Sequence, residues 1–119
     1  MKVRFKGVEG VERRVRQGSA TLREGIDYSV LEIFCQSDGV NFFRIECRDG
    51  DIPGLFDSRI FELREAGFQS SWTFTLEADG SMTIGPASWA EPGFWEDYMD
   101  GKVQAYEAYR YERDRIMGS

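Results

Sequence analysis

Residues 27–36, DYSVLEIFCQ, and residues 42–47, FFRIEC, lie on either side of the dipeptide Asp38-Gly39. Both segments are rich in β-branched and aromatic residues, which favour strands. Asp-Gly between two such segments is typical of a hairpin turn. The sequence therefore predicts an antiparallel β-hairpin.

The register of this hairpin depends on its loop. A two-residue turn would place Ile33 opposite Arg44, so that an apolar side chain faces a charged one. A three-residue loop over residues 38–40, with its glycine at positive φ, places Cys35 opposite Phe43 and buries one uniformly apolar face. We therefore expect the three-residue loop.

The same register separates the two cysteines of the chain. Leu31, and not Cys35, would lie opposite Cys47, which leaves the sulfurs roughly 13 Å apart along the strands. A disulfide does not span that distance, so we expect two free thiols, as in a reducing cytoplasm. Without histidine or a second cysteine pair, they also form a poor metal site.

A second hairpin is predicted for residues 71–84. In SWTFTLE (71–77), apolar and polar residues alternate as in a strand. Ala78-Asp79-Gly80 is expected to form the turn, and SMTI (81–84) the second strand. Strict alternation places Trp72, Phe74 and Leu76 on one face, which we expect to lie in the core. The periodicity of residues 58–65, between the two hairpins, fits either one short strand or two helical turns, and we favour the strand.

Beyond Gly85-Pro86 the pattern becomes helical. Glu91-Pro92-Gly93 is typical of a helix N-terminus and predicts a helix over residues 94–99, and a second helix follows Gly101 over residues 102–117. We expect this second helix to pack on the sheet through a broad face, interrupted by Lys102 and Arg113, made of Val103, Ala105, Tyr106, Tyr109, Ile116 and Met117.

Length and composition limit the fold and the chemistry. With 119 residues, 41% of them hydrophobic, we expect a single α+β domain over residues 1–119. Its expected core is an antiparallel sheet of about five or six strands, covered on one face by the C-terminal helices. The chain has no histidine, which excludes Ser-His and Cys-His nucleophile pairs and imidazole metal sites.

The net charge of −6 argues against binding to nucleic acid, because affinity for phosphate depends on clustered Lys and Arg. The basic residues of the N-terminal arm, residues 2–17, alternate with valines and phenylalanine. We interpret this arm as an amphipathic strand or hairpin with a solvated face.

No apolar run reaches the roughly 18 residues of a membrane span, and residues 1–6 lack the apolar core of a signal peptide. A cytoplasmic protein that binds no membrane is therefore expected.

A group of carboxylates surrounded by aromatic residues is the first candidate site. One interpretation is glycosidase-like acid–base catalysis, although a small domain rarely supplies the walled cleft that this needs. A second is purely structural, with the aromatic residues anchoring a helix to the sheet. A third is an interface in which aromatic anchors and a charged rim meet a basic protein. The residues concerned are Glu91, Glu96, Asp97 and Asp100, with Trp89 and Trp95 as candidate anchors.

A second candidate is the loop that contains Asp49, Asp51 and Asp57, which could suggest Ca²⁺. Pro53 occupies a position where an EF-hand loop needs an oxygen ligand, so we expect an ordinary surface turn. We predict no cofactor, no metal and no catalytic residue.

The C-terminal half, residues 60–117, resembles a group of small bacterial immunity proteins of polymorphic and contact-dependent toxin systems. The most specific part of the resemblance is Pro92-Gly93-Phe94-Trp95-Glu96. The other matching segments are Trp72-Thr73-Phe74, residues 79–86, Trp89, Glu91, Asp97-Tyr98, Asp100-Gly101 and Ala105.

This resemblance implies a small, cytoplasmic, non-catalytic protein that neutralises a cognate toxin by direct contact. An acidic protein would be attracted to the basic cleft of a nuclease toxin. Two alternatives stay open. One is a small-molecule-binding or enzymatic domain that uses a crevice between sheet and helix. The other is a structural protein that associates through an apolar edge strand or surface patch.

Overall fold

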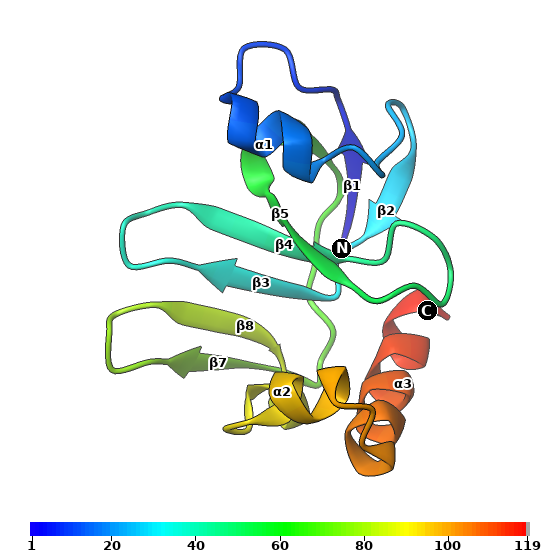
Figure 1. Cartoon of the computed structure of the whole chain (residues 1–119). Coiled ribbons are helices and arrows are strands. Elements are labelled where there is room, and N and C mark those ends of the chain that lie inside the picture. Colours follow the sequence, from blue (N-terminus) through cyan, green and yellow to red (C-terminus); the bar gives the residue numbers. More distant parts are fainter. Residues whose placement is uncertain (119) are drawn as a thin grey trace.

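The α+β class predicted from the sequence is confirmed by the computed structural model, which describes residues 1–118 (Figure 1). Within these residues the strands form two antiparallel sheets, and not the one sheet that we expected. The three-stranded sheet has the order β2-β1-β6, made of β1 Lys2–Phe5, β2 Asp27–Ser29 and β6 Phe61–Glu65. The five-stranded sheet has the order β5-β4-β3-β8-β7, made of β3 Glu32–Cys35, β4 Asn41–Ile45, β5 Gly54–Asp57, β7 Trp72–Leu76 and β8 Met82–Pro86.

The helices lie at two ends of the molecule. Figure 1 shows α1 beside the three-stranded sheet, whereas α2 and α3 lie together at the opposite end. The predictions of helices over residues 94–99 and 102–117 are confirmed by α2 and α3. The helical segments are α1 Arg13–Gly18, the 3-10 turns η1 Ser58–Ile60 and η2 Ala87–Ala90, α2 Phe94–Met99 and α3 Val103–Met117.

The division into two sheets occurs inside the segment that we expected to be one long strand. β2 ends at Ser29, β3 begins at Glu32, and the two residues between them are completely buried. Val30 packs into the core that the two sheets share, and Leu31 packs into a second core beneath the C-terminal helices. Because both residues are apolar, the hydrophobic pattern does not reveal the change of sheet.

The first hairpin has a three-residue loop, as predicted, but the loop lies one residue earlier than the expected residues 38–40, and the register differs. Gln36 N–H donates to the Val40 carbonyl, so the loop consists of residues 37–39, with Gly39 at a φ of 96°. The predicted pairing of Cys35 with Phe43 is wrong, because Cys35 lies opposite Asn41. The shift of two residues leaves Ile33, Cys35, Phe43 and Ile45 together on the predicted face, whereas Leu31 packs into the other core.

The second hairpin forms as predicted, and Trp72 of its expected core face is partly buried against both cores, but the other two residues of that face are not in the core. Glu77 N–H donates to the Ser81 carbonyl across residues 78–80. Phe74 and Leu76 are 62% and 67% exposed. β7 is an edge strand, and the face that it shares with β3 and β5 is buried at Ile33 and Phe56 but not at Phe74 and Leu76. Alternation identifies the residues that share a face but not how far the covering layer extends.

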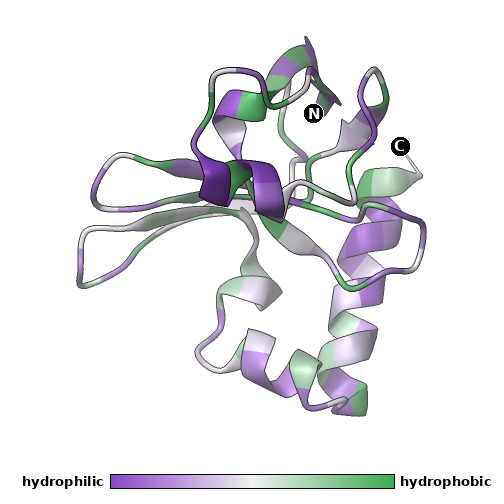
Figure 2. Cartoon of the chain, turned by 45° about the horizontal axis from the view of Figure 1, so that its top comes forward, coloured by the Kyte–Doolittle hydropathy of each residue, from purple (hydrophilic) through white to green (hydrophobic). Residues whose placement is uncertain are grey.

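Helix α3 contacts the rest of the protein through a narrower stripe than we expected. Its buried residues are Ala105, Tyr109, Arg113 and Ile116, which follow the helical repeat. Val103, Tyr106 and Met117, which we assigned to the packed face, are exposed. Figure 2 shows the resulting bands of hydrophilic and hydrophobic residues along the helix.

The N-terminal arm is only partly a strand. Residues 2–5 form β1, as expected for its alternating pattern, whereas residues 13–18 form α1. The Arg4 guanidinium donates to Asp27 on the neighbouring strand, with 2.7 Å between Nε and Oδ1. This ion pair lies on the surface of the three-stranded sheet, in agreement with a solvated face.

Candidate functional site

A crevice of about 330 Å³ lies between the five-stranded sheet and the segment from η2 to α2. Glu32, Arg44 and Leu55 occupy successive cross-strand positions on β3, β4 and β5, so their side chains share one face of the sheet. Residues 89–96 form the opposite wall. The remaining lining residues are Phe34, Glu77 and Thr83.

Aromatic packing fixes this opposite wall. The Trp89 ring stacks on Tyr109 of α3 with 5.1 Å between ring centroids and meets the edge of Trp95 at 5.6 Å. Gly93 adopts a φ of 80°, which favours glycine, and turns the chain into α2. Phe94 N–H donates to the Glu91 carbonyl at 3.0 Å and closes that turn. The segment is therefore held rigidly against α3.

A buried ion pair forms the floor of the crevice. Glu32 is 2% exposed, and its Oε1 accepts a hydrogen bond of 2.8 Å from Arg44 Nε. The Arg44 guanidinium carbon lies 3.7 Å from the centroid of the Trp95 ring, which is a cation–π contact. The side chain of Arg44 thus contacts both the five-stranded sheet and α2.

A glycine on the neighbouring strand makes room for Glu32. A Cβ atom at Gly85 would lie 2.9 Å from Cγ of Glu32, closer than carbon atoms approach without a clash. The side chain of Glu32 therefore occupies the space above Gly85. This close approach explains why a glycine occurs in the middle of β8.

Part of the hydrogen-bonding capacity of this ion pair is unused. Within residues 1–118, Oε2 of Glu32 and the Nη atoms of Arg44 make no hydrogen bond. Burial raises the pKa of Glu32, while the charge and hydrogen bond of Arg44 oppose that rise. The crevice therefore contains a buried carboxyl group with a free oxygen.

The residues that sequence analysis proposed for binding occupy three different environments. Trp89 is 2% exposed and belongs to the core, while Trp95 is half-buried and lines the crevice. Glu91 and Glu96 line its rim and are exposed. The other two acidic residues lie on α2 or at its end and do not line the crevice: Asp97 pairs with Lys102 at 3.2 Å, and Asp100 is exposed.

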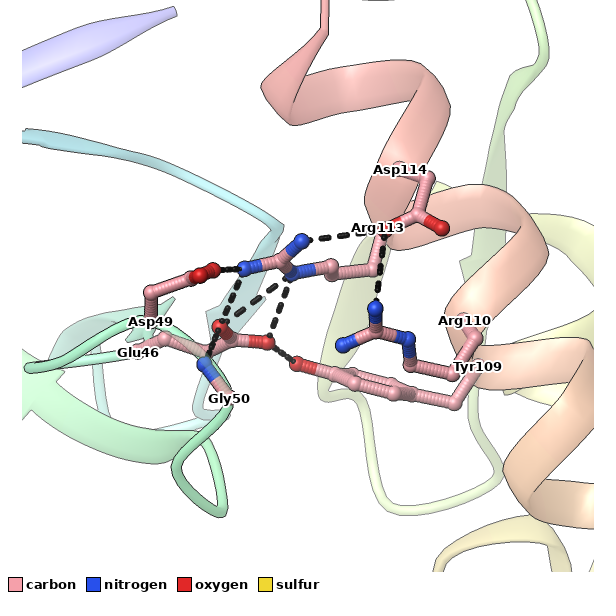
Figure 3. Close-up of polar contacts among 7 residues, drawn as sticks. All are labelled: Glu46, Asp49, Gly50, Tyr109, Arg110, Arg113 and Asp114. Atoms are coloured by element: carbon pink, nitrogen blue, oxygen red, sulfur yellow. Dashed lines mark hydrogen bonds and ion pairs between the residues drawn. The ribbon is translucent and has the colours of Figure 1, made fainter.

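A second charged cluster, which sequence reasoning missed, lies at the other end of α3 (Figure 3). The Glu46 side chain is 1% exposed and accepts hydrogen bonds from Arg113, Tyr109 and the Gly50 N–H. Arg113 also pairs with Asp49. The only signal in the sequence was an arginine inside the apolar stripe of α3. All of these groups are satisfied by one another, so the cluster anchors α3 to the loop after β4.

A larger hollow, of about 620 Å³, lies among α1, β5, η1 and the turn between β3 and β4. Its central guanidinium, Arg59, donates to both Asp57 and Glu12 at 2.8 Å. The hydrogen bond from Arg59 lowers the pKa of Asp57. Because Arg59, Asp57 and Glu12 satisfy one another, the smaller crevice is the better candidate for a binding site.

The residues of the candidate calcium loop do not form one loop: Asp49 and Asp51 lie in a turn, whereas Asp57 ends strand β5. Asp49 pairs with Arg113, and Asp57 accepts hydrogen bonds from Arg59. The described residues contain no group of three acidic or cysteine side chains that could hold a metal ion. Cys35 and Cys47 are both free thiols, as predicted.

Comparison with family models, with curated proteins and with solved structures finds no match to this chain. None of the helices in residues 1–118 has the length and apolar character needed to cross a membrane. Function therefore has to be argued from the crevice and the surface around it.

Proposed function

We propose that this chain is a non-catalytic binding protein that captures a basic partner protein, and that it acts as a cytoplasmic immunity protein against a bacterial toxin. The observation that carries the proposal is the position of the acidic residues. Four acidic residues lie along one rigid segment. Two of them, Glu91 and Glu96, line the mouth of the crevice, and Asp97 and Asp100 lie beside it. They form the surface that we call the acidic rim.

The acidic rim has charge available for a partner. In the described part of the chain, Glu91, Glu96 and Asp100 make no ion pair, and only Asp97 is paired, with Lys102. The whole chain has a net charge of −6. Such a surface attracts a basic protein over distance and accelerates its association.

The resemblance to immunity proteins supports the same conclusion. Its most specific segment, residues 92–96, forms one wall of the crevice and carries part of the acidic rim. A non-catalytic role agrees with the exposure of Glu91 and Glu96, because acid–base catalysis on a sugar needs two carboxyl groups enclosed in a cleft. Two free thiols agree with the cytoplasm, where such a toxin would act.

A second candidate function is binding of a small molecule in the crevice. The free oxygen of Glu32 favours it, because this oxygen is open to the crevice and can accept a hydrogen bond from a bound molecule. The volume of the crevice argues against small-molecule binding, because it lies at the lower limit for ligand pockets. The protein-binding proposal accounts for the acidic rim as well as the crevice.

Charge reversal tests the acidic rim. We expect the double substitution Glu96→Lys and Asp97→Lys to slow association with the captured partner by about tenfold at low salt, because steering by charge is lost. The loss should shrink as salt increases, since screening removes steering from the wild type as well. Association rates at two ionic strengths give this result directly.

A matched control keeps the change in net charge the same. Glu62→Lys with Glu65→Lys alters two exposed residues of β6, in the other sheet. This control should change association much less, and melting temperatures should show that both double variants are folded. Unchanged kinetics in the α2 variant would remove the acidic rim from the proposal.

A further inference from the structure

The crevice contains a polar group that the fold leaves half-satisfied. Glu32 is almost completely buried, and one of its oxygens is held by Arg44 at 2.8 Å. The other oxygen has no hydrogen-bond partner within residues 1–118 and belongs to a side chain that lines the crevice. This oxygen is not sealed inside the core but is open to the crevice, so a bound group can donate a hydrogen bond to it.

The charges around the crevice select among donors. Four glutamates and one arginine line it, so acceptors and negative charge predominate. Arg44 is the single positive charge of the lining; it donates to Glu32 only through Nε, and its guanidinium lies against the Trp95 ring. An anionic ligand would be repelled by Glu77, Glu91 and Glu96, whereas a cationic donor would be attracted by them.

The apolar part of the lining fits the stem of such a donor. Phe34 and Leu55 lie on the sheet side, and Pro92 and Phe94 lie on the opposite wall. Long basic side chains bury their methylene groups against apolar surface and keep the charged end at polar groups. The crevice combines both kinds of surface.

We propose that the crevice receives the basic side chain, lysine or arginine, of the partner protein, with the charged end donating to the free oxygen of Glu32 and to Glu91 or Glu96. This inference rests on the proposed function and identifies its central contact. The acidic rim would attract the partner, and the crevice would select one side chain of it.

The test uses the complete protein and a simple probe, so it does not depend on finding the partner. Nα-acetyl-arginine amide and Nα-acetyl-lysine amide are titrated against isotopically labelled protein, and amide and indole NMR shifts are followed. We expect saturable shifts at Trp95, Gly93 and Gly85 with a Kd on the order of millimolar. The amides of Gly10 and Gly39, remote from the lining, should not shift.

A neutral probe and two sets of variants make the result specific. Nα-acetyl-citrulline amide has nearly the shape of the arginine probe but no charge, and it should bind at least about tenfold more weakly. Glu32→Gln should weaken arginine binding by a similar factor. Because Glu32 is buried, Glu91→Gln with Glu96→Gln, at the exposed rim, provides a second variant without risk to the fold. Glu62→Gln with Glu65→Gln is its matched control and should bind normally.

The outcomes separate this inference from the proposed function. Equal binding of the citrulline and arginine probes, or no saturable shift with either cationic probe, would overturn the basic-side-chain site. Capture of a basic partner together with that negative titration would leave the proposed function standing without this contact. Selective binding of the cationic probes, with no basic protein captured, would support the site and overturn the protein-binding function.

Discussion

Arg113→Met lowers the free energy of unfolding by about 3–5 kcal/mol, because it leaves the Glu46 carboxylate buried without its main partner. Three hydrogen bonds of 3.0–3.2 Å join Arg113 to Glu46, and both side chains are less than a tenth exposed. Tyr109 donates to the same carboxylate, and burial raises the pKa of its phenol, so it stays protonated as a donor. Urea unfolding of the variant and the wild type measures the difference.

The same helix offers a control for this prediction. Arg115→Met makes an identical substitution at a side chain that is 47% exposed and pairs with Glu112 at 3.6 Å. Exposed pairs contribute little, so we expect a loss below about 1 kcal/mol. Combining Glu46→Gln with Arg113→Met removes both charges, keeps an acceptor for Tyr109 and should recover much of the loss. A loss for Arg113→Met no larger than that of Arg115→Met would contradict the anchoring role of this cluster.

Trp89→Ala is expected to cost about 3–5 kcal/mol as well, because it removes the largest side chain of the core beneath the helices. The Trp89 ring contacts Tyr109, Phe94 and Trp95, and all three would lose a packing surface. Any loss of partner binding in this variant would therefore be indirect. Thermal and urea unfolding of the isolated protein show the effect without a partner.

Phe74→Ala, compared with Trp89→Ala, tests whether the face of β7 that carries Phe74 is exposed. Phe74 is 62% exposed on the edge strand β7, so we expect a change within about 1 kcal/mol. If Phe74→Ala were as destabilising as Trp89→Ala, the face of β7 would be covered and its description as exposed would be wrong.

Local signals were sufficient to predict most elements of this fold. Gly93 and Gly101 interrupt the chain at positive φ, so the predicted bounds of α2 and α3 agree closely with the structure. The loop of the second hairpin, residues 78–80, was predicted correctly, whereas the length of the first loop was predicted but its position was one residue too late. Each of these features depends on a few neighbouring residues.

Features that depend on distant residues could not be predicted. The change of sheet between Ser29 and Glu32 leaves no trace in a continuous apolar pattern. The exposure of Phe74 depends on how far the covering layer reaches. The complete burial of Trp89 and the half-burial of Trp95 depend on where α3 returns along the chain.

Only one side of the candidate site was predicted from the sequence. The wall with Glu91, Trp95 and Glu96 was identified from one continuous segment. The floor, made of Glu32 and Arg44, was not, because the register that we expected did not place these two residues opposite each other. An ion pair across two strands becomes visible only when the register is known.

Co-expression with the product of the neighbouring gene tests the binding proposal most directly. The tagged protein is recovered, its mass is measured under native conditions, and growth of the host is followed with and without it. We predict that the neighbour is basic and toxic, that it is recovered in a stoichiometric complex, and that the wild-type protein suppresses its toxicity better than the Glu96→Lys, Asp97→Lys variant. A harmless neighbour and a protein recovered alone would contradict the proposal.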